Sequence, residues 1–319
     1  MGKTGEVSRV EASAAWSDWQ PLAAHPALSA EVLAEILDGG QAFRWHHETD
    51  GVWLGIWSDC IARLRLDSAG HVEWCAPAPL VGRVAAALPT YFNTDADHAA
   101  LVGSLPWRSD AHLVRCLDEF PGLRILQQPF GETLLGFLCS ATKQIAQIKQ
   151  MLAFLAARHG APLLPETSFL TFPSSRFHRL PTWLELAAIP ESDLRACQLG
   201  FRALYIHQTA QFLAAQPRWL EETKPLPYLA AKARLLELPG VGDKIADCVL
   251  LFGAGKLEAF PVDTWILQAL ANRYGLTGWK PAQLAQFGRA HFGPLAGLAQ
   301  QYLFACERRA AKAPLSRNS

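Results

Sequence analysis

A glycine-rich break between two helical runs constrains the fold of this chain more than any other feature. Residues 228–238 (YLAAKARLLEL) carry apolar side chains at helical spacing, and residues 239–242 (PGVG) end that helix. Asp243 is expected to cap a second helix over residues 244–252. Glycines in such a hairpin let backbone N–H groups approach a phosphate, and the N-terminus of the next helix favours an anion. This pattern predicts a helix, a hairpin and a helix that suit a nucleic-acid backbone.

Lys244 stands in the first turn of that second helix, at the positive end of the helix dipole. This field, together with partial desolvation, favours the neutral amine, which is the form that attacks an electrophilic carbon. Lys244 is therefore a candidate nucleophile. The alternative is a solvated lysine with no role beyond the start of a helix.

Asp263 lies nineteen residues further on, after Pro261 and Val262 and before a periodic run at residues 264–275. It could simply be the N-cap of that helix. The two roles are compatible, because a carboxylate fixed by capping hydrogen bonds can also stabilise positive charge that develops on a sugar ring, or orient the amine. Asp263 is thus the second candidate catalytic residue.

These motifs carry a family resemblance. LPGVGDKIADC followed by PVD resembles the helix-hairpin-helix, Gly-Pro-Asp superfamily of base-excision DNA glycosylases, and the lysine points to members with lyase activity. Together with GQAFRW at residues 40–45 and QQYLF at residues 300–304, the chain is similar to the 8-oxoguanine DNA glycosylase family from about residue 30 to residue 310. The resemblance implies a double-stranded DNA partner that contains 8-oxoguanine.

The implied reaction is base flipping, attack of the Lys244 amine at C1′, formation of a Schiff base and β-elimination of the 3′ phosphate. Two rival functions remain open. An alkylpurine glycosylase of the same superfamily would use the aspartate without a lysine, so Lys244 counts against it. A non-catalytic helix-hairpin-helix DNA-binding protein would need neither Asp263 nor Gln300.

The expected fold class is α+β, in three segments. Residues 1–27 are predicted to be a loosely ordered tail. Residues 28–120 read as an N-terminal antiparallel sheet domain, with a strand pattern from about residue 28 that is clearest in three runs. Those runs are residues 52–57, 60–66 and 71–74. Residues 121–319 are predicted to form an all-α helix-hairpin-helix glycosylase domain.

Four residues are expected to hold the flipped base. Gly40 lets a backbone carbonyl approach a ligand closely, and the resemblance implies that this carbonyl accepts from N7–H of the oxidised base, where guanine has only an acceptor. Gln300 and Phe304 are four residues apart and share a helix face. The resemblance implies that Gln300 reads the base edge while Cys248 and Phe304 sandwich the ring. The alternative for Cys248 and Phe304 is a place in the hydrophobic core.

Further residues are expected to contact the DNA around the lesion. The resemblance implies that Phe201 wedges into the duplex and that Arg202 contacts the base left behind; the alternatives are helix packing for Phe201 and an ordinary surface position for Arg202. Trp265 departs from the family, which commonly has a phosphate-contacting histidine there, and Thr142 and Lys143 replace part of an asparagine-rich run. The hairpin residues Gly240, Val241 and Gly242 complete the predicted DNA contacts.

The charge is unevenly distributed, although the formal net charge is zero. Residues 1–120 contain 8 Lys and Arg against 16 Asp and Glu, whereas residues 121–319 contain 21 against 13. The basic half includes the hairpin. This asymmetry is typical of a protein whose phosphate contacts are confined to one part.

No metal or organic cofactor is expected. The seven cysteines are scattered and none forms a Cys-x-x-Cys pair, so the sequence predicts neither structural zinc nor an iron–sulfur cluster. The resemblance also allows a cation held by hairpin carbonyls around Leu236, Leu238 and Val241. No run reaches the roughly 18 apolar residues of a membrane helix. We expect a monomer that acts in the cytoplasm, associated with the nucleoid, or in the nucleus of a eukaryote.

Overall fold

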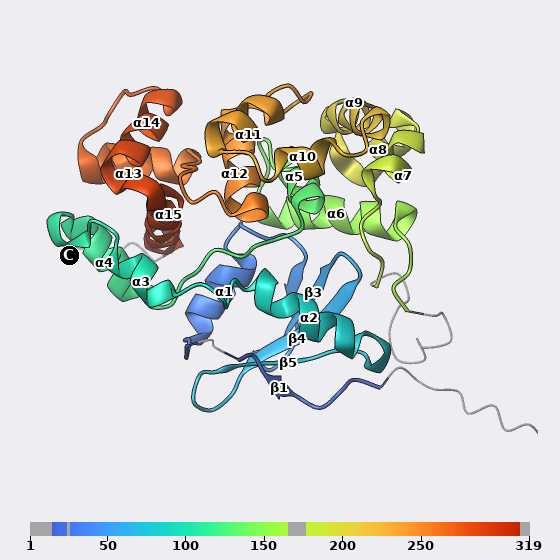
Figure 1. Cartoon of the computed structure of the whole chain (residues 1–319), viewed down its shortest axis with the longest axis horizontal. Helices are drawn as coiled ribbons and strands as arrows, with labels where there is room; N and C mark the ends of the chain where they lie inside the picture. Colours follow the sequence, from blue (N-terminus) through green and yellow to red (C-terminus); the bar gives the residue numbers. More distant parts are fainter. Residues whose placement is uncertain (1–14, 24–25, 165–176, 313–319) are drawn as a thin grey trace, which may run out of the picture.

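The computed structural model describes residues 15–23, 26–164 and 177–312. The first fourteen residues of the predicted tail therefore lie outside the described part. Figure 1 shows a sheet on one side of the molecule and a broad layer of helices on the other. This arrangement confirms the expected α+β class.

The sheet has five antiparallel strands in the order β1-β5-β4-β3-β2. The strands are β1 (Gln20–Pro21), β2 (Trp45–His47), β3 (Trp53–Trp57), β4 (Cys60–Leu66) and β5 (Val72–Cys75). The three strongest strand patterns of the sequence became β3, β4 and β5. β1 pairs with β5, so part of the segment before residue 28 forms an edge of the sheet.

The strand predicted from about residue 28 is wrong at its start. This region forms helix α1 (Ala30–Asp38), whose N-cap Ser29 accepts a hydrogen bond from the Val32 N–H. Four apolar residues at helical spacing turn toward the core: Val32, Leu33, Ile36 and Leu37. The cap at Ser29 and the 3.6-residue spacing of the apolar residues favour a helix here, and the strand pattern applies only to the later segments.

The other helices and helical turns cover the sheet or build the second layer. They are α2 (Val81–Tyr91), α3 (His98–Gly103), α4 (Ala111–Glu119), α5 (Phe130–Leu138), α6 (Ile145–His159), α7 (Trp183–Ala188), α8 (Glu191–Leu194), α9 (Arg202–Ala215), α10 (Trp219–Thr223), α11 (Tyr228–Leu235), α12 (Asp243–Ala254), α13 (Thr264–Tyr274), α14 (Pro281–Phe292) and α15 (Ala296–Lys312), with shorter turns at Ala78–Leu80, Trp107–Ser109, Arg195–Leu199 and Gly293–Leu295. In the described part of the chain, no helix combines the length and apolarity needed to cross a bilayer.

Three helix contacts position the site. α5 packs along α12, where the rings of Phe137 and Phe252 stack with centroids 5.6 Å apart. α15 packs against α13, and also against α4. α4 therefore lies beside the helical layer (Figure 1), although its residues precede the domain boundary expected at residue 120. That boundary remains a prediction.

The hairpin joins α11 to α12, as its pattern predicts. Gly240 adopts φ +78°, a left-handed conformation that suits glycine. The cap assignment was wrong by one residue: Gly242 occupies the N-cap without a side-chain bond, and Asp243 is the first residue of α12. The Asp243 side chain instead pairs with Lys232 of α11 at 3.1 Å.

Candidate active site

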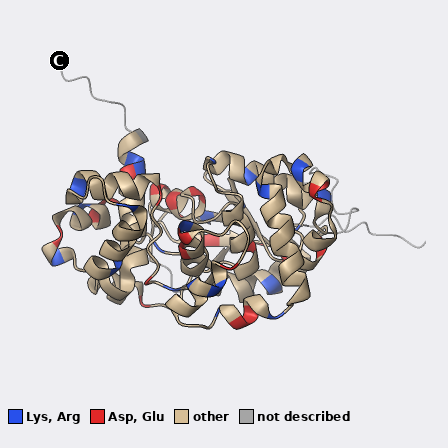
Figure 2. Ribbon diagram, turned by 90° about the horizontal axis from the view of Figure 1, so that it is seen from above, with Lys and Arg blue, Asp and Glu red and all other residues tan. Residues whose placement is uncertain are grey.

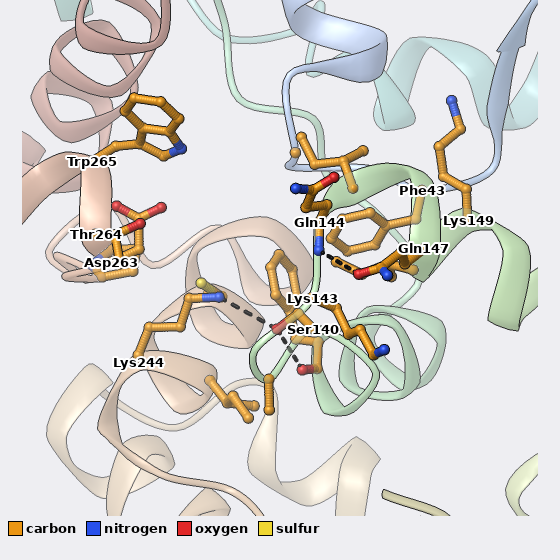
Figure 3. A pocket seen from close by; sticks show the side chains of 18 of the residues that line it. Phe43, Ser140, Lys143, Gln144, Gln147, Lys149, Lys244, Asp263, Thr264 and Trp265 are labelled. Carbon is orange, nitrogen blue, oxygen red and sulfur yellow. Dashed lines mark hydrogen bonds between the residues drawn. The ribbon is translucent and has the colours of Figure 1, made fainter. Parts of the chain in front are cut away.

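A cavity of about 1490 Å³ opens where α1, the α5–α6 connection, α12, α13 and α15 meet. Figure 3 shows Lys244, Asp263 and Trp265 on one side of it and Ser140, Lys143 and Gln144 on the other. Most of the predicted site residues line this cavity: Gly40, Thr142, Lys143, Gly242, Lys244, Cys248, Asp263, Trp265, Gln300 and Phe304. The remaining four, Phe201, Arg202, Gly240 and Val241, are not part of its lining.

Lys244 is half-buried in the first turn of α12 and is held by α5. Its Nζ donates to Ser140 Oγ at 3.3 Å and lies 5.3 Å from the centroid of the Phe137 ring. The Ser140 hydroxyl in turn donates to the Phe137 carbonyl at 2.7 Å. Since that hydroxyl hydrogen is engaged, Ser140 offers Lys244 only an acceptor. The lysine thus points into the cavity rather than into solvent.

Asp263 is the N-cap of α13 and faces the same cavity (Figure 3). Its Oδ1 accepts from the Ile266 N–H at 2.9 Å, which confirms the predicted cap. Burial raises the pKa of Asp263 above its ordinary value, while the Ile266 N–H and the positive charge of Lys244 oppose that rise. The charged carboxylate is therefore less favoured than the cap alone would make it.

Cys248 and Phe304 line the same cavity as Gly40. Gly40 has φ +109°, and a Cβ there would lie 3.7 Å from Phe304 Cζ, so the backbone of Gly40 is close to the phenylalanine ring. Cys248 lies one turn after Lys244, and burial raises the pKa of its thiol to about 12. The thiol is therefore neutral and serves as a compact, polarisable surface.

The loop that carries Gly40 is fixed by the amide of Gln41. Gln41 Nε2 donates to the Arg124 carbonyl at 3.1 Å, and its Oε1 accepts from the Leu126 N–H at 2.9 Å. The backbone carbonyl of Gln41 also accepts from Gln128 Nε2 at 2.6 Å. No local pattern points to these contacts, because their partners are more than 80 residues away in the sequence.

Gln300 is buried on α15, with 3% of its surface exposed. Its Nε2 donates to the Pro261 carbonyl at 3.2 Å, two residues before Asp263. Its Oε1 accepts from Gln301 Nε2 at 2.7 Å. The amide thus links α15 to the segment that carries Asp263.

Phe201 and Arg202 lie at the start of α9. Phe201 is 52% exposed, so it is not a core residue, and its ring contacts Tyr205 edge-on with centroids 6.2 Å apart. Arg202 is not a surface residue: it is 3% exposed and donates to Thr142 Oγ1 at 3.0 Å, to the Leu199 carbonyl at 3.2 Å and to the Ala141 carbonyl. Arg202 therefore fixes the α5–α6 connection beside the cavity.

One cavity brings together the hairpin residue Gly242, Lys244 and Asp263 at two helix starts, and the amide of Gln300. This combination on this fold is typical of a helix-hairpin-helix DNA glycosylase. The 8-oxoguanine DNA glycosylase N-terminal domain family matches residues 27–134. N-glycosylase/DNA lyase OGG1 of Arabidopsis thaliana is 30% identical over 86% of this chain and 76% of its own length. The chain belongs to the 8-oxoguanine DNA glycosylase family, and it is a bifunctional DNA N-glycosylase and AP lyase.

A further relative and a solved structure support the same family, and a second solved structure shares the fold alone. A probable N-glycosylase/DNA lyase of Methanothermobacter thermautotrophicus is 30% identical over 63% of this chain and 68% of its own length. The Clostridium acetobutylicum 8-oxoguanine glycosylase/lyase, solved with double-stranded DNA containing cytosine opposite 8-oxoG, superposes with a TM-score of 0.79 at 30% identity and covers 88% of this chain and 92% of that one. The 3-methyladenine DNA-glycosylase of Archaeoglobus fulgidus shares the fold, with a TM-score of 0.69, 20% identity and coverage of 91% and 98%.

Proposed function

We propose that this protein removes 8-oxoguanine from double-stranded DNA and then cleaves the strand, with Lys244 as the nucleophile and Asp263 as its electrostatic partner. The observation that carries the proposal is that Lys244, Asp263, Gln300 and Gly40 line one cavity. A flipped nucleotide can reach all four at once, whereas a duplex base cannot.

The base is held in the part of the cavity between α12 and α15. Cys248 and Phe304 enclose its faces, Gln300 bonds to its edge, and a backbone carbonyl at Gly40 accepts from N7–H. Guanine has an acceptor at N7 in place of this donor, so the same carbonyl repels the undamaged base. A buried polar contact of this kind discriminates strongly between donor and acceptor.

The neutral amine of Lys244 forms a bond to C1′, and the glycosidic bond breaks with its electron pair leaving on the base, which takes up a proton. The amine nitrogen gives up a proton, the C1′–O4′ bond breaks, O4′ takes up a proton, and the ring opens to a Schiff base. Loss of a C2′ proton then expels the 3′ phosphate and cuts the strand. Asp263 stabilises the positive charge that develops on the sugar.

The hairpin and Trp265 contact the backbone of the damaged strand. Gly242 is exposed at the start of α12, so its N–H can approach a phosphate. Trp265 lines the cavity beside Asp263 and can donate only through its indole N–H. Phe201 occupies the gap that the flipped base leaves, and the protein works as a monomer on chromosomal DNA, in the cytoplasm or in a nucleus.

The test is covalent trapping on a duplex that contains 8-oxoguanine. Borohydride reduces the Schiff base, so the wild-type protein should be captured on the DNA, while Lys244→Gln should give neither capture nor strand cleavage and should bind and unfold as the wild type does. An enzyme that uses only the aspartate, such as an alkylpurine glycosylase, or a non-catalytic binding protein would not be captured. Cleavage by Lys244→Gln at the wild-type rate would refute the nucleophile assignment.

A further inference from the structure

Gln301, the neighbour of Gln300 on α15, also lines the cavity. Its side chain is buried, with 9% of the residue exposed, and its Nε2 donates to Gln300 Oε1 at 2.7 Å. The following residues, Tyr302 and Leu303, are buried in the core. Burying an amide costs free energy unless its polar atoms form hydrogen bonds, so we expect this side chain to have a function.

The chemistry of the contacts fixes the order of the two amides. The Pro261 carbonyl can only accept, so Gln300 must turn its nitrogen toward it, at 3.2 Å. Gln300 Oε1 then faces Gln301, which must present its own nitrogen. The direction of both hydrogen bonds is therefore set by the carbonyl oxygen of Pro261.

Two anchors hold an amide more firmly than one. With the Pro261 contact alone, the amide of Gln300 can still rotate about the bond to its side-chain carbons. The second bond, from Gln301, fixes the amide plane. One N–H of Nε2 and one lone pair of Oε1 remain unused by these two contacts, and they can face the edge of a base.

We propose that Gln301 is a positioning residue for base recognition, which acts by holding the Gln300 amide in the plane that the edge of the flipped base requires. This inference rests on the proposed function. An amide that is ordered before the base arrives does not pay for ordering upon binding. Gln301 should therefore affect lesion excision and leave the chemistry at an abasic site alone.

The variant Gln301→Met keeps the length and volume of the side chain and removes the donor. We expect single-turnover excision of 8-oxoguanine to slow by about five- to tenfold, as for the loss of one buried hydrogen bond. Strand cleavage at a preformed abasic site should stay at the wild-type rate. Gln301→Glu, which has the same shape but an acceptor in place of the amide nitrogen, should slow excision at least as much.

A double-mutant cycle separates positioning from a merely structural role. If Gln301 acts only through Gln300, then Gln301→Met should have no further effect on excision once Gln300 is replaced by alanine. Gln286→Ala, on the exposed side of α14 and outside the cavity, is the control and should excise at the wild-type rate. Additive effects of the two substitutions, or equal slowing on the lesion and on the abasic site, would overturn the inference.

Failure of the proposed function and failure of the positioning role of Gln301 give different results. If the wild-type protein is not trapped by borohydride, the proposed function itself is wrong. If it is trapped and both Gln301 variants excise 8-oxoguanine at the wild-type rate, only the positioning role is wrong.

Discussion

Lys244 and Asp263 are both placed by the beginning of a helix. Lys244 lies in the first turn of α12, and Asp263 is the N-cap of α13. The capping bond of Asp263 and its proposed catalytic charge use the same carboxylate, so one substitution can separate them. Ser140 provides a third contact, since it accepts from Lys244 across the cavity.

Asp263→Asn should lower the rate of base excision by about 10²–10³-fold, the order seen when one preorganised electrostatic contact is removed. The fold should keep its stability. The Ile266 N–H donates to Asp263 Oδ1 at 2.9 Å in the wild type, and the amide oxygen of asparagine can still accept this hydrogen bond. Single-turnover excision and thermal unfolding check this. A clear fall in Tm with most of the activity retained would support a purely structural role for Asp263.

Ser140→Ala should slow borohydride trapping by about tenfold, because Lys244 loses the acceptor that holds it in place. The Phe137 carbonyl keeps its bond from the Ser140 N–H at 3.0 Å, so the loss of stability should be no more than about 1 kcal/mol. Ser104→Ala is the matched control: its hydroxyl donates to the Ala100 carbonyl at 2.8 Å at the end of α3, outside the cavity. Equal trapping rates for the two variants would contradict a role for Ser140.

At the scale of elements, the hairpin and the start of α9 form one unit. A Cβ at Gly240 would lie 2.7 Å from Cγ of Tyr205, so the hairpin packs directly on that ring. Tyr205 also contacts Phe201, the proposed wedge. The hairpin, which is the proposed phosphate contact, and Phe201, which is the proposed wedge, therefore share Tyr205 as an aromatic support.

Gly242→Ala should weaken DNA binding by about tenfold or more without lowering Tm. A Cβ there meets no protein atom within 4 Å, but it would stand where a phosphate approaches the N-terminus of α12. Gly275→Ala offers the opposite pattern as a control, because φ +70° strains an alanine by about 1–2 kcal/mol at a site outside the cavity. Binding titrations and thermal unfolding of both variants give the comparison, and unchanged affinity of Gly242→Ala would exclude this hairpin contact.

At the scale of the whole molecule, a net charge of zero gives no overall attraction to DNA, although residues 121–319 hold 21 Lys and Arg against 13 Asp and Glu. Lys and Arg are spread over the helices rather than gathered in one patch (Figure 2). We therefore expect binding to depend on directed contacts around the cavity, from the hairpin on one side and from the α5–α6 connection on the other. The latter carries Thr142, which adopts φ +54° and accepts from Arg202.

Thr142→Asn should raise Tm and sharpen the preference for cytosine opposite the lesion. A β-branched residue is strained at positive φ, whereas asparagine tolerates it. An amide also presents a donor and an acceptor in a fixed order, which the hydroxyl cannot do. Single-turnover rates for 8-oxoguanine opposite C, T, G and A measure the change. If the wild-type protein already has a strong cytosine preference that survives Arg202→Lys, another residue reads the opposite base.

The sequence alone determined the features that depend on neighbours along the chain. The Gly-rich hairpin, the cap at Asp263 and the strands β3, β4 and β5 follow from turn chemistry and periodicity. Lys244 and Cys248 share one helix face, and Gln300 and Phe304 share another, because each pair is separated by four residues. These patterns and the family resemblance together named ten of the residues that line the cavity.

Only the tertiary structure decided the contacts between distant segments. Ser140 and Lys244 are 104 residues apart, and Arg202 is buried against a loop 60 residues before it, whereas the sequence offered either a DNA contact or a surface position for this arginine. The anchoring of Gln300 by Pro261 and Gln301 also depends on how α15 packs beside α13. Local periodicity predicts which face of a helix is apolar. The partner of each polar group is set by the packing that brings distant helices together.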